Sequence, residues 1–308
     1  MKKYFILLLL HSTVNAQSVL PLSGFQNVLS IYNPAAAGIN SGTECSIIHK
    51  TQWTGFPQAP KFYGISLNSP LNYERFGIGF NLYKESSGVQ NFLSANGSFS
   101  YKINLAKGRL SYGVKLGLVQ WNEDFSNLTV KDPGEAVNGQ KKTALDIGGG
   151  LLYKNKKYLV GLSANYSPSI YIGNKFINKI YYTISFGMKQ KISSTLDLHP
   201  ALLVRYTSGF SPMLSVSMPF EYKRFLWVGA SYRSSSILSI MAGVNLHQII
   251  PNLGNRISVF YYFDYSGNRK SMKLGNSHEI LLFYIPGKNK SVESIKRNRA
   301  TVSPLFFD

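Results

Sequence analysis

The sequence predicts an all-β fold: a closed transmembrane antiparallel β-barrel of about fourteen strands. Three observations lead to this prediction. The chain begins with an export signal, and most of the remaining chain alternates between apolar and polar residues with a period of two. Aromatic residues, including 20 Tyr and 19 Phe, gather near the ends of the alternating segments. After the signal, no stretch reaches the ~18 apolar residues that a membrane helix needs.

Residues 1–16 form the predicted signal peptide. Lys2 and Lys3 give it a basic start, residues 4–10 are apolar, and residues 14–16 are a small-residue cleavage site. No cysteine follows the cleavage site, so the pattern is not that of a lipoprotein signal. We therefore expect an exported chain.

The exported chain is strongly basic. The full sequence has 33 Lys and Arg against 14 Asp and Glu, a net charge of +19. Because the chain is expected to leave the cytoplasm, nucleic acid is not an expected partner, whereas lipid phosphates and acidic proteins are. A single cysteine, Cys45, excludes an intrachain disulfide, so a large core or closure of the sheet must hold the fold.

Residues 110–118 show the alternation clearly. The apolar positions are Leu110, Tyr112, Val114, Leu116 and Leu118, and the polar or small ones are Ser111, Gly113, Lys115 and Gly117. Such alternation gives a strand one apolar and one polar face. The polar faces are rich in Gly, Ser and Asn, which favours a barrel lumen over the outside of a soluble sandwich. We therefore expect Leu116 to face lipid and Lys115 to tolerate substitution.

The predicted strands are 44–51, 61–68, 74–84, 92–105, 109–121, 143–154, 158–167, 181–192, 196–207, 212–222, 225–234, 237–247, 256–265 and 277–285. Two predicted girdles of aromatic residues lie at their ends: Tyr153, Tyr158, Tyr222, Phe225 and Trp227 at one, and Tyr83, Trp121, Tyr166, Tyr206, Tyr232 and Tyr265 at the other. Long connections are expected at 122–142 and 168–180. In outer-membrane barrels long loops face outside and short turns face the periplasm.

The predicted organisation has four parts. Residues 1–16 are the signal peptide, 17–43 an N-terminal periplasmic or plug segment, 44–285 the outer-membrane barrel, and 286–308 a basic periplasmic tail. An even number of strands returns the chain to the side on which it started, so both flanking parts are placed in the periplasm.

Two short sequences resemble the signature of a known family. The string Tyr32-Asn33-Pro34-Ala35-Ala36-Ala37-Gly38, followed by Gln52-Trp53-Thr54-Gly55-Phe56 and Ala59-Pro60, resembles the N-terminal signature of the PorP/SprF family. Ser277-His278-Glu279-Ile280, on the last predicted strand, resembles its C-terminal element. The resemblance covers nearly the whole mature chain, in order and spacing. Residues 286–308 depart from it, because family members tend to stop near the last strand.

The resemblance implies a function that the residues alone do not give. It implies an outer-membrane component of the Bacteroidetes type IX secretion and gliding machinery that binds, and anchors or helps to export, a secreted cell-surface protein. The implied partners are the C-terminal domain of that cargo, such as an adhesin, other secretion components and outer-membrane lipid. A passive or small-solute outer-membrane transport barrel remains the alternative.

Candidate partner-binding residues are Gln52, Trp53, Phe56, Pro57 and Pro60, in the first predicted external loop. Exposed aromatic residues rimmed by polar groups mark such surfaces. Equally, Trp53 would serve as a girdle aromatic while the prolines shape the loop.

The signature residues Tyr32, Asn33, Pro34, Ala35 and Gly38 would either contact a partner or form a compact plug, and small residues favour the plug. His278 and Glu279 belong to the C-terminal element of the signature.

No catalytic chemistry is expected. The histidines are scattered without metal-ligand spacing, and no Gly-x-Ser-x-Gly elbow occurs. The sequence therefore predicts no enzyme activity, metal or cofactor. Gly148-Gly149-Gly150 lies inside an alternating segment, where it would let the barrel bend or let another group approach the wall.

Overall fold

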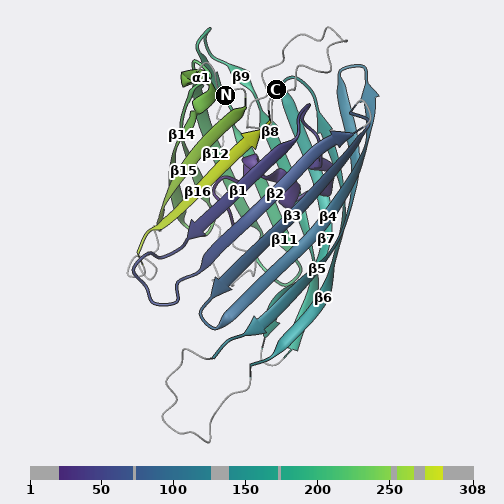
Figure 1. The fold of residues 1–308 in the computed structure, drawn as a ribbon, viewed down its shortest axis with the longest axis vertical. Coiled ribbons are helices and arrows are strands. Elements are labelled where there is room, and N and C mark those ends of the chain that lie inside the picture. The colour runs from purple at the N-terminus through teal and green to yellow at the C-terminus, as the bar shows by residue number, and fades with distance from the viewer. Residues whose placement is uncertain are drawn as a thin grey trace, which may run out of the picture.

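A computed structural model gives the fold of residues 21–71, 74–125, 139–172, 175–250, 255–266 and 275–286. These residues form an antiparallel barrel with a short segment inside it (Figure 1). The predicted signal peptide and nearly all of the predicted tail lie outside the described residues. None of the described helices is long and apolar enough to cross a membrane.

The wall consists of sixteen strand segments, with one short helix, α1 (Leu246–Ile249), between the fourteenth and fifteenth: β1 (Glu44–Thr51), β2 (Lys61–Leu71), β3 (Phe76–Ser87), β4 (Gln90–Leu105), β5 (Gly108–Glu123), β6 (Lys141–Lys154), β7 (Tyr158–Ile172), β8 (Lys175–Met188), β9 (Gln190–Lys191), β10 (Leu196–Leu198), β11 (Ala201–Thr207), β12 (Met213–Tyr222), β13 (Leu226–Arg233), β14 (Ile237–Asn245), β15 (Arg256–Ser266) and β16 (Ser277–Ile285). The short pieces β9 and β10 continue β8 and β11, so the sixteen segments make fourteen strands.

The barrel closes because its first and last strands pair. β1 pairs with β16, with Ile48 opposite Leu281, and β11 pairs with both β8 and β12. Closure satisfies the backbone groups that an open sheet edge would expose to lipid. The predicted barrel class and the count of fourteen are confirmed.

One predicted loop is wrong. The sequence predicts a long connection at residues 168–180, but β7 runs to Ile172 and β8 begins at Lys175. Pro168 favours the loop prediction because proline cannot donate to a sheet ladder. In the structure the pairing shifts register between Pro168 and Ile170, a β-bulge, where proline is tolerated.

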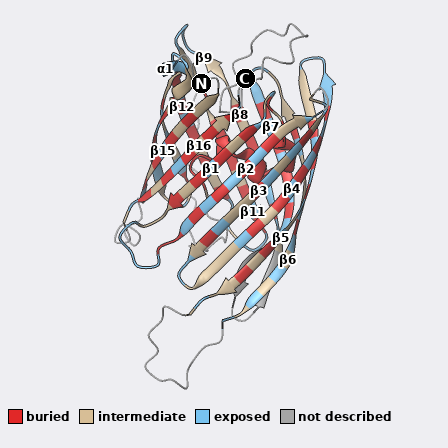
Figure 2. Ribbon diagram, in the orientation of Figure 1, coloured by how far each residue is buried: buried red, intermediate tan, exposed pale blue. Residues whose placement is uncertain are grey.

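The apolar faces point outward as predicted. Val114, Leu116 and Leu118 are 61%, 65% and 53% exposed, whereas Lys115 is only 4% exposed. Figure 2 shows the same alternation of buried and exposed residues along the strands.

Most of the predicted girdle tyrosines also face outward. Tyr158, Tyr166, Tyr206, Tyr222, Tyr232 and Tyr265 are among the exposed residues. Trp121 and Trp227 are 0% exposed, so their girdle assignment is wrong. They occupy inward positions of the pleat, while Val228, one residue after Trp227, points outward.

Residues 21–40 lie inside the barrel, and we call them the lumen segment (purple in Figure 1). They form three short 3₁₀ turns, η1 (Phe25–Asn27), η2 (Leu29–Ile31) and η3 (Pro34–Ala36). Residues 22–38 are all buried, and their apolar members form one core with inward residues of the wall.

Candidate functional site

The start of the lumen segment is held by a carboxylate on the last strand. The two oxygens of Glu279 accept hydrogen bonds from the backbone N–H groups of Ser23 and Gly24, each at 2.8 Å. Glu279 is 0% exposed. Hydrogen bonds to a buried charged acceptor are stronger than neutral ones, so this contact fixes the segment against β16.

Three more charged side chains complete the cluster around Glu279. Lys50 on β1 lies 2.7 Å from Asp264 on β15 and 3.1 Å from Glu279. Lys50 also donates to the carbonyl of Pro21, and Arg233 on β13 donates to the hydroxyl of Ser23. We call Lys50, Arg233, Asp264 and Glu279 the charged cluster. Its two cations balance its two carboxylates, which makes burial of all four tolerable.

The middle of the segment binds the wall through neutral groups. The side-chain amide of Asn27 donates to the hydroxyl of Tyr262 at 2.9 Å. Asn68 on β2 donates to the hydroxyl of Ser30 at 3.0 Å, and that hydroxyl lies 3.1 Å from Ser66. Polar residues on the inner faces of the strands therefore bind the segment.

The signature string forms the last part of the lumen segment. The carbonyl of Tyr32 accepts from Ser163 at 2.8 Å and from Asn165 at 3.0 Å, both on β7. The guanidinium of Arg205 lies 5.8 Å from the Tyr32 ring. Burial raises the pKa of the Tyr32 hydroxyl above its ordinary value, so the ring stays neutral.

Asn33 caps η3 and joins it to two strands. Its side-chain oxygen accepts from the N–H of Ala35 at 2.9 Å, which is an N-cap bond. Its side-chain amide donates to the carbonyls of Leu151 on β6 and Leu162 on β7. Pro34 follows at the first position of η3, where a missing N–H costs nothing.

Glycines in the wall let η3 approach closely. A Cβ added to Gly113 would lie 2.2 Å from the nitrogen of Ala35, and one added to Gly77 would lie 2.1 Å from the carbonyl of Ala37. A Cβ on Gly150 would meet the side chain of Asn33 at 2.0 Å. For Gly150, the sequence interpretation that another group approaches the wall is therefore confirmed.

Gly38 ends the string with a turn that favours glycine. Its φ is +56°, and a Cβ there would lie 2.4 Å from the carbonyl of Ser69. The ammonium of Lys102 donates to the Gly38 carbonyl, and the hydroxyl of Ser100 donates to that of Ala37.

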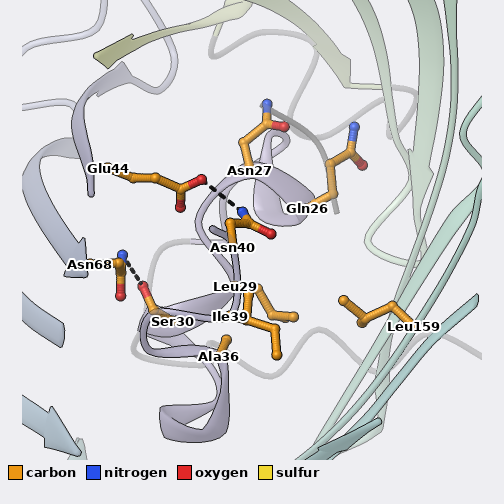
Figure 3. Close-up of a pocket in the computed structure, with 10 residues that line it drawn as sticks. All are labelled: Gln26, Asn27, Leu29, Ser30, Ala36, Ile39, Asn40, Glu44, Asn68 and Leu159. Carbon is orange, nitrogen blue, oxygen red and sulfur yellow. Dashed lines mark hydrogen bonds between the residues drawn. The ribbon is translucent and has the colours of Figure 1, made fainter. Parts of the chain in front are cut away.

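A small cavity borders the segment (Figure 3). Its volume is about 30 Å³, and its lining includes Ser30, Ile39, Asn40, Asn68 and, across the lumen, Leu159. A buried water needs roughly 10–15 Å³ by this measure, so the cavity has room for about two. The space is too small for a drug-sized ligand.

The candidate partner-binding residues lie in the connection from β1 to β2. Phe56 is 50% exposed and Pro57 is exposed, Gln52 and Trp53 are half-buried, and Pro60 is buried. The connection is folded: the N–H of Gln52 donates to the carbonyl of Pro60, and that of Thr54 to Asn276 before β16. Phe56 and Pro57 are therefore the accessible part of the predicted surface.

The two signature residues on β16 face opposite ways. Glu279 points into the lumen, whereas the Nδ1 atom of His278 lies 2.6 Å from the hydroxyl of Tyr261, an exposed contact. His278 therefore takes no part in holding the lumen segment.

One group of described side chains has metal-ligand types. Asp197, His199 and Glu221 each place a ligand atom within 4.8 Å of the other two. The Nε2 atom of His199 lies 3.1 Å from Glu221, and Lys189 forms an ion pair with Asp197 at 3.3 Å. The spacing search missed this group because Glu221 comes from a neighbouring strand.

The prediction that Lys115 tolerates substitution is wrong. Its ammonium lies 2.7 Å from a carboxylate oxygen of Asp146, and the two side chains are 1% and 0% exposed. Removing either charge would leave the other buried without its partner.

Sequence reasoning also missed Lys50, Arg233 and Asp264. All three occupy polar-face positions of alternating strands, and an ionisable residue there is the signal that would have found them. Their mutual proximity depends on closure between β1 and β16.

The fold and the site define a class: an outer-membrane β-barrel whose lumen contains its own N-terminal segment. The chain belongs to the PorP/SprF family, because the family model described as "Type IX secretion system membrane protein PorP/SprF" matches residues 14–284. It is thus an outer-membrane protein of type IX secretion, and this family is not an enzyme class. Membership implies other components of that system as partners.

Solved structures resemble this chain at low identity. A FadL homologue of Pseudomonas aeruginosa is 12% identical, with a TM-score of 0.49 over 83% of this chain and 93% of that one. A deltaS2 mutant of the monoaromatic hydrocarbon channel TodX is 10% identical, with a TM-score of 0.50 over 85% and 94%. The toluene transporter TodX of Pseudomonas putida is 12% identical, with a TM-score of 0.46 over 85% and 94%. No curated protein matches the chain.

Proposed function

We propose that this barrel binds a secreted cell-surface protein and anchors it or assists its export. In this role the lower end in Figure 1, where β1 and β5 end and β6 begins, faces outside, and the end with α1 faces the periplasm. The longer connections then lie outside, as in other outer-membrane barrels. The candidate contact residues Phe56 and Pro57 fall at the outer end.

The segment buried inside the barrel is the observation that carries this proposal. Residues 22–38 are buried inside the wall and are fastened by the charged cluster at one end and by Asn33 and Gly38 at the other. A solute channel needs an open or readily opened path, whereas an anchor needs a rigid scaffold for its loops. The fixed segment supports the anchor over the small-solute transport barrel.

Deleting the gene in its native host tests the proposal. Surface proteins would be labelled with a membrane-impermeant biotin reagent in the wild type, the deletion strain and the complemented strain. We expect at least one secreted protein to leave the surface in the deletion strain, for the medium or the periplasm, and to return on complementation. An unchanged set of surface proteins, together with steady ion conductance of the purified barrel in a planar bilayer, would support transport instead.

A further inference from the structure

The pairing between β6 and β7 stops before either strand ends. The last pair is Ile147 opposite Tyr166. β6 nevertheless extends from Ile147 down to Lys141, and β7 extends from Tyr166 to Ile172. Each strand thus continues for six residues without pairing to the other. On its other side, β6 stays paired with β5 along its whole length, as far as Lys141 opposite Asn122.

The free part of β7 is poorly suited to accept another strand. It contains Pro168, which has no N–H, and a register shift follows between Pro168 and Ile170. Prolines and bulges are among the features that protect sheet edges. The hairpin of β7 and β8 is held on its other side, where Lys179 donates to the carbonyl of Ser208 at 2.7 Å and lies 4.7 Å from the ring of Phe210. These contacts join the hairpin to the end of β11.

Residues 141–146 of β6 pair with no described strand other than β5, and they have neither of these two features. They contain no proline, and their pairing with β5 is regular. Every second residue of such an edge directs its N–H and C=O groups away from the paired neighbour. These groups form a template for one more strand.

The position of this edge favours a partner from outside the cell. Outward residues on β5 and β6 near the seam are apolar up to Leu118 and Leu145, which are 53% and 55% exposed. Farther down β6, the exposed residues are Thr143 and Lys141. The edge thus begins at the lower margin of the apolar face and continues toward water, at the end proposed to face outside.

We propose that residues 141–146 of β6 bind an extended acidic segment of the secreted partner, which adds to the sheet as a strand antiparallel to β6. This inference rests on the proposed function and names its mode of recognition, strand addition. Charge favours an acidic segment, because the exposed Lys141 begins the edge and the one acid within it, Asp146, is already paired with Lys115. An apolar residue of the partner would pack beside Leu145.

Closing the edge with a disulfide tests the inference. Continuing the register by two residues beyond Ile147 and Tyr166, short of the bulge, brings position 145 opposite 168, so the variant is Leu145→Cys with Pro168→Cys in a Cys45→Ser background. The matched control is Leu151→Cys with Leu162→Cys, an outward pair within the paired part of the same two strands. A bis-maleimide linker replaces the disulfide where oxidation is incomplete.

The probe is a short fluorescent peptide of alternating Glu and Val, with alternating Lys and Val as its charge control. Binding to the purified full-length barrel in nanodiscs would be followed by fluorescence anisotropy. We expect the acidic peptide to bind the parent barrel. The closed variant should bind it at least ~10-fold more weakly than the parent. Reducing the disulfide, or cutting a cleavable cross-linker, should restore binding. The control pair should bind like the parent. Equal binding to the closed and open forms would overturn the inference.

Hydrogen exchange gives an independent readout on the unmodified chain. The amides of residues 141–146 that point away from β5 should exchange faster than their neighbours, and the acidic peptide should slow them. Fast exchange that saturating peptide leaves unchanged would also overturn the inference. Slow exchange without peptide would overturn it too, because it would indicate that this chain or a second copy already covers the edge.

In cells, the closed variant separates this inference from the proposed function. If the wild type retains its partner and the closed variant does not, both stand. If both retain it equally, the function stands and the edge is wrong. If the wild type retains no surface protein that the deletion strain loses, the proposed function itself fails.

Discussion

Replacing Glu279 with glutamine is expected to loosen the lumen segment while leaving the barrel assembled. Glu279 accepts two backbone N–H groups at 2.8 Å and lies 3.1 Å from Lys50. Glutamine keeps one acceptor oxygen but turns its NH₂ toward the second N–H, and it removes a charge. Each hydrogen bond to a charged group contributes ~1.5–3 kcal/mol. With one bond lost and the other weakened, docking of the segment should weaken by about 3 kcal/mol.

Hydrogen exchange of residues 21–40 measures this loss. A change of about 3 kcal/mol corresponds to ~100-fold faster exchange of amides that open with the segment. Amides of the β-strands should change little, because strand pairing closes the barrel independently of the segment.

The matched control is Glu74→Gln. Glu74 forms an ion pair with Arg109, but the two side chains are 16% and 37% exposed, so the loss should stay below ~1 kcal/mol. If Glu279→Gln and Glu74→Gln gave the same exchange in residues 22–24, the charged cluster would not be what holds the segment.

Three substitutions and one deletion give further predictions. Gly113→Ala should displace the lumen segment or lower the melting temperature, because the new Cβ would lie 2.2 Å from the backbone nitrogen of Ala35. Gly97→Ala is the control and should have no such effect, since its nearest contact would be at 4.0 Å. Thermal unfolding in detergent compares the two variants. Leu116→Arg should lower the free energy of unfolding by ~2–4 kcal/mol, because it places a charge on the lipid face. Lys115→Leu should lower it by ~3–5 kcal/mol, because the buried carboxylate of Asp146 loses its partner. Urea unfolding in lipid vesicles measures both, and an unchanged stability of Lys115→Leu would contradict the assignment of Lys115 to the lumen. Deleting residues 126–138 should spare assembly, judged by heat-modifiable gel mobility, yet release the partner from the surface, and full retention would move the binding surface elsewhere.

The barrel is readable from the sequence because side chains on a strand alternate with a period of two. Lipid demands an apolar residue at every outward position, so Val114, Leu116 and Leu118 define the faces without knowledge of any neighbour. The strand count is readable for the same reason, and the even number agrees with a closed barrel. The string from Tyr32 to Gly38 likewise identifies the family.

The failures of the sequence reasoning share a cause. Residue type alone places Trp121 and Trp227 at the membrane surface, but pleat parity points both inward. Lys115 looks tolerant in the sequence because its partner Asp146 lies on the next strand. Pro168 favours the start of a loop, although a bulge accommodates it within β7.

What the sequence determined by itself is the local pattern: strand faces, number of strands and family. Only the tertiary structure decided what fills the lumen, because that depends on residues brought together by barrel closure. Ser23, Lys50, Arg233, Asp264 and Glu279 are far apart along the chain, yet hydrogen bonds and ion pairs join them in one cluster. Their contacts arise when β16 returns to β1, and no periodicity within a single strand encodes that meeting.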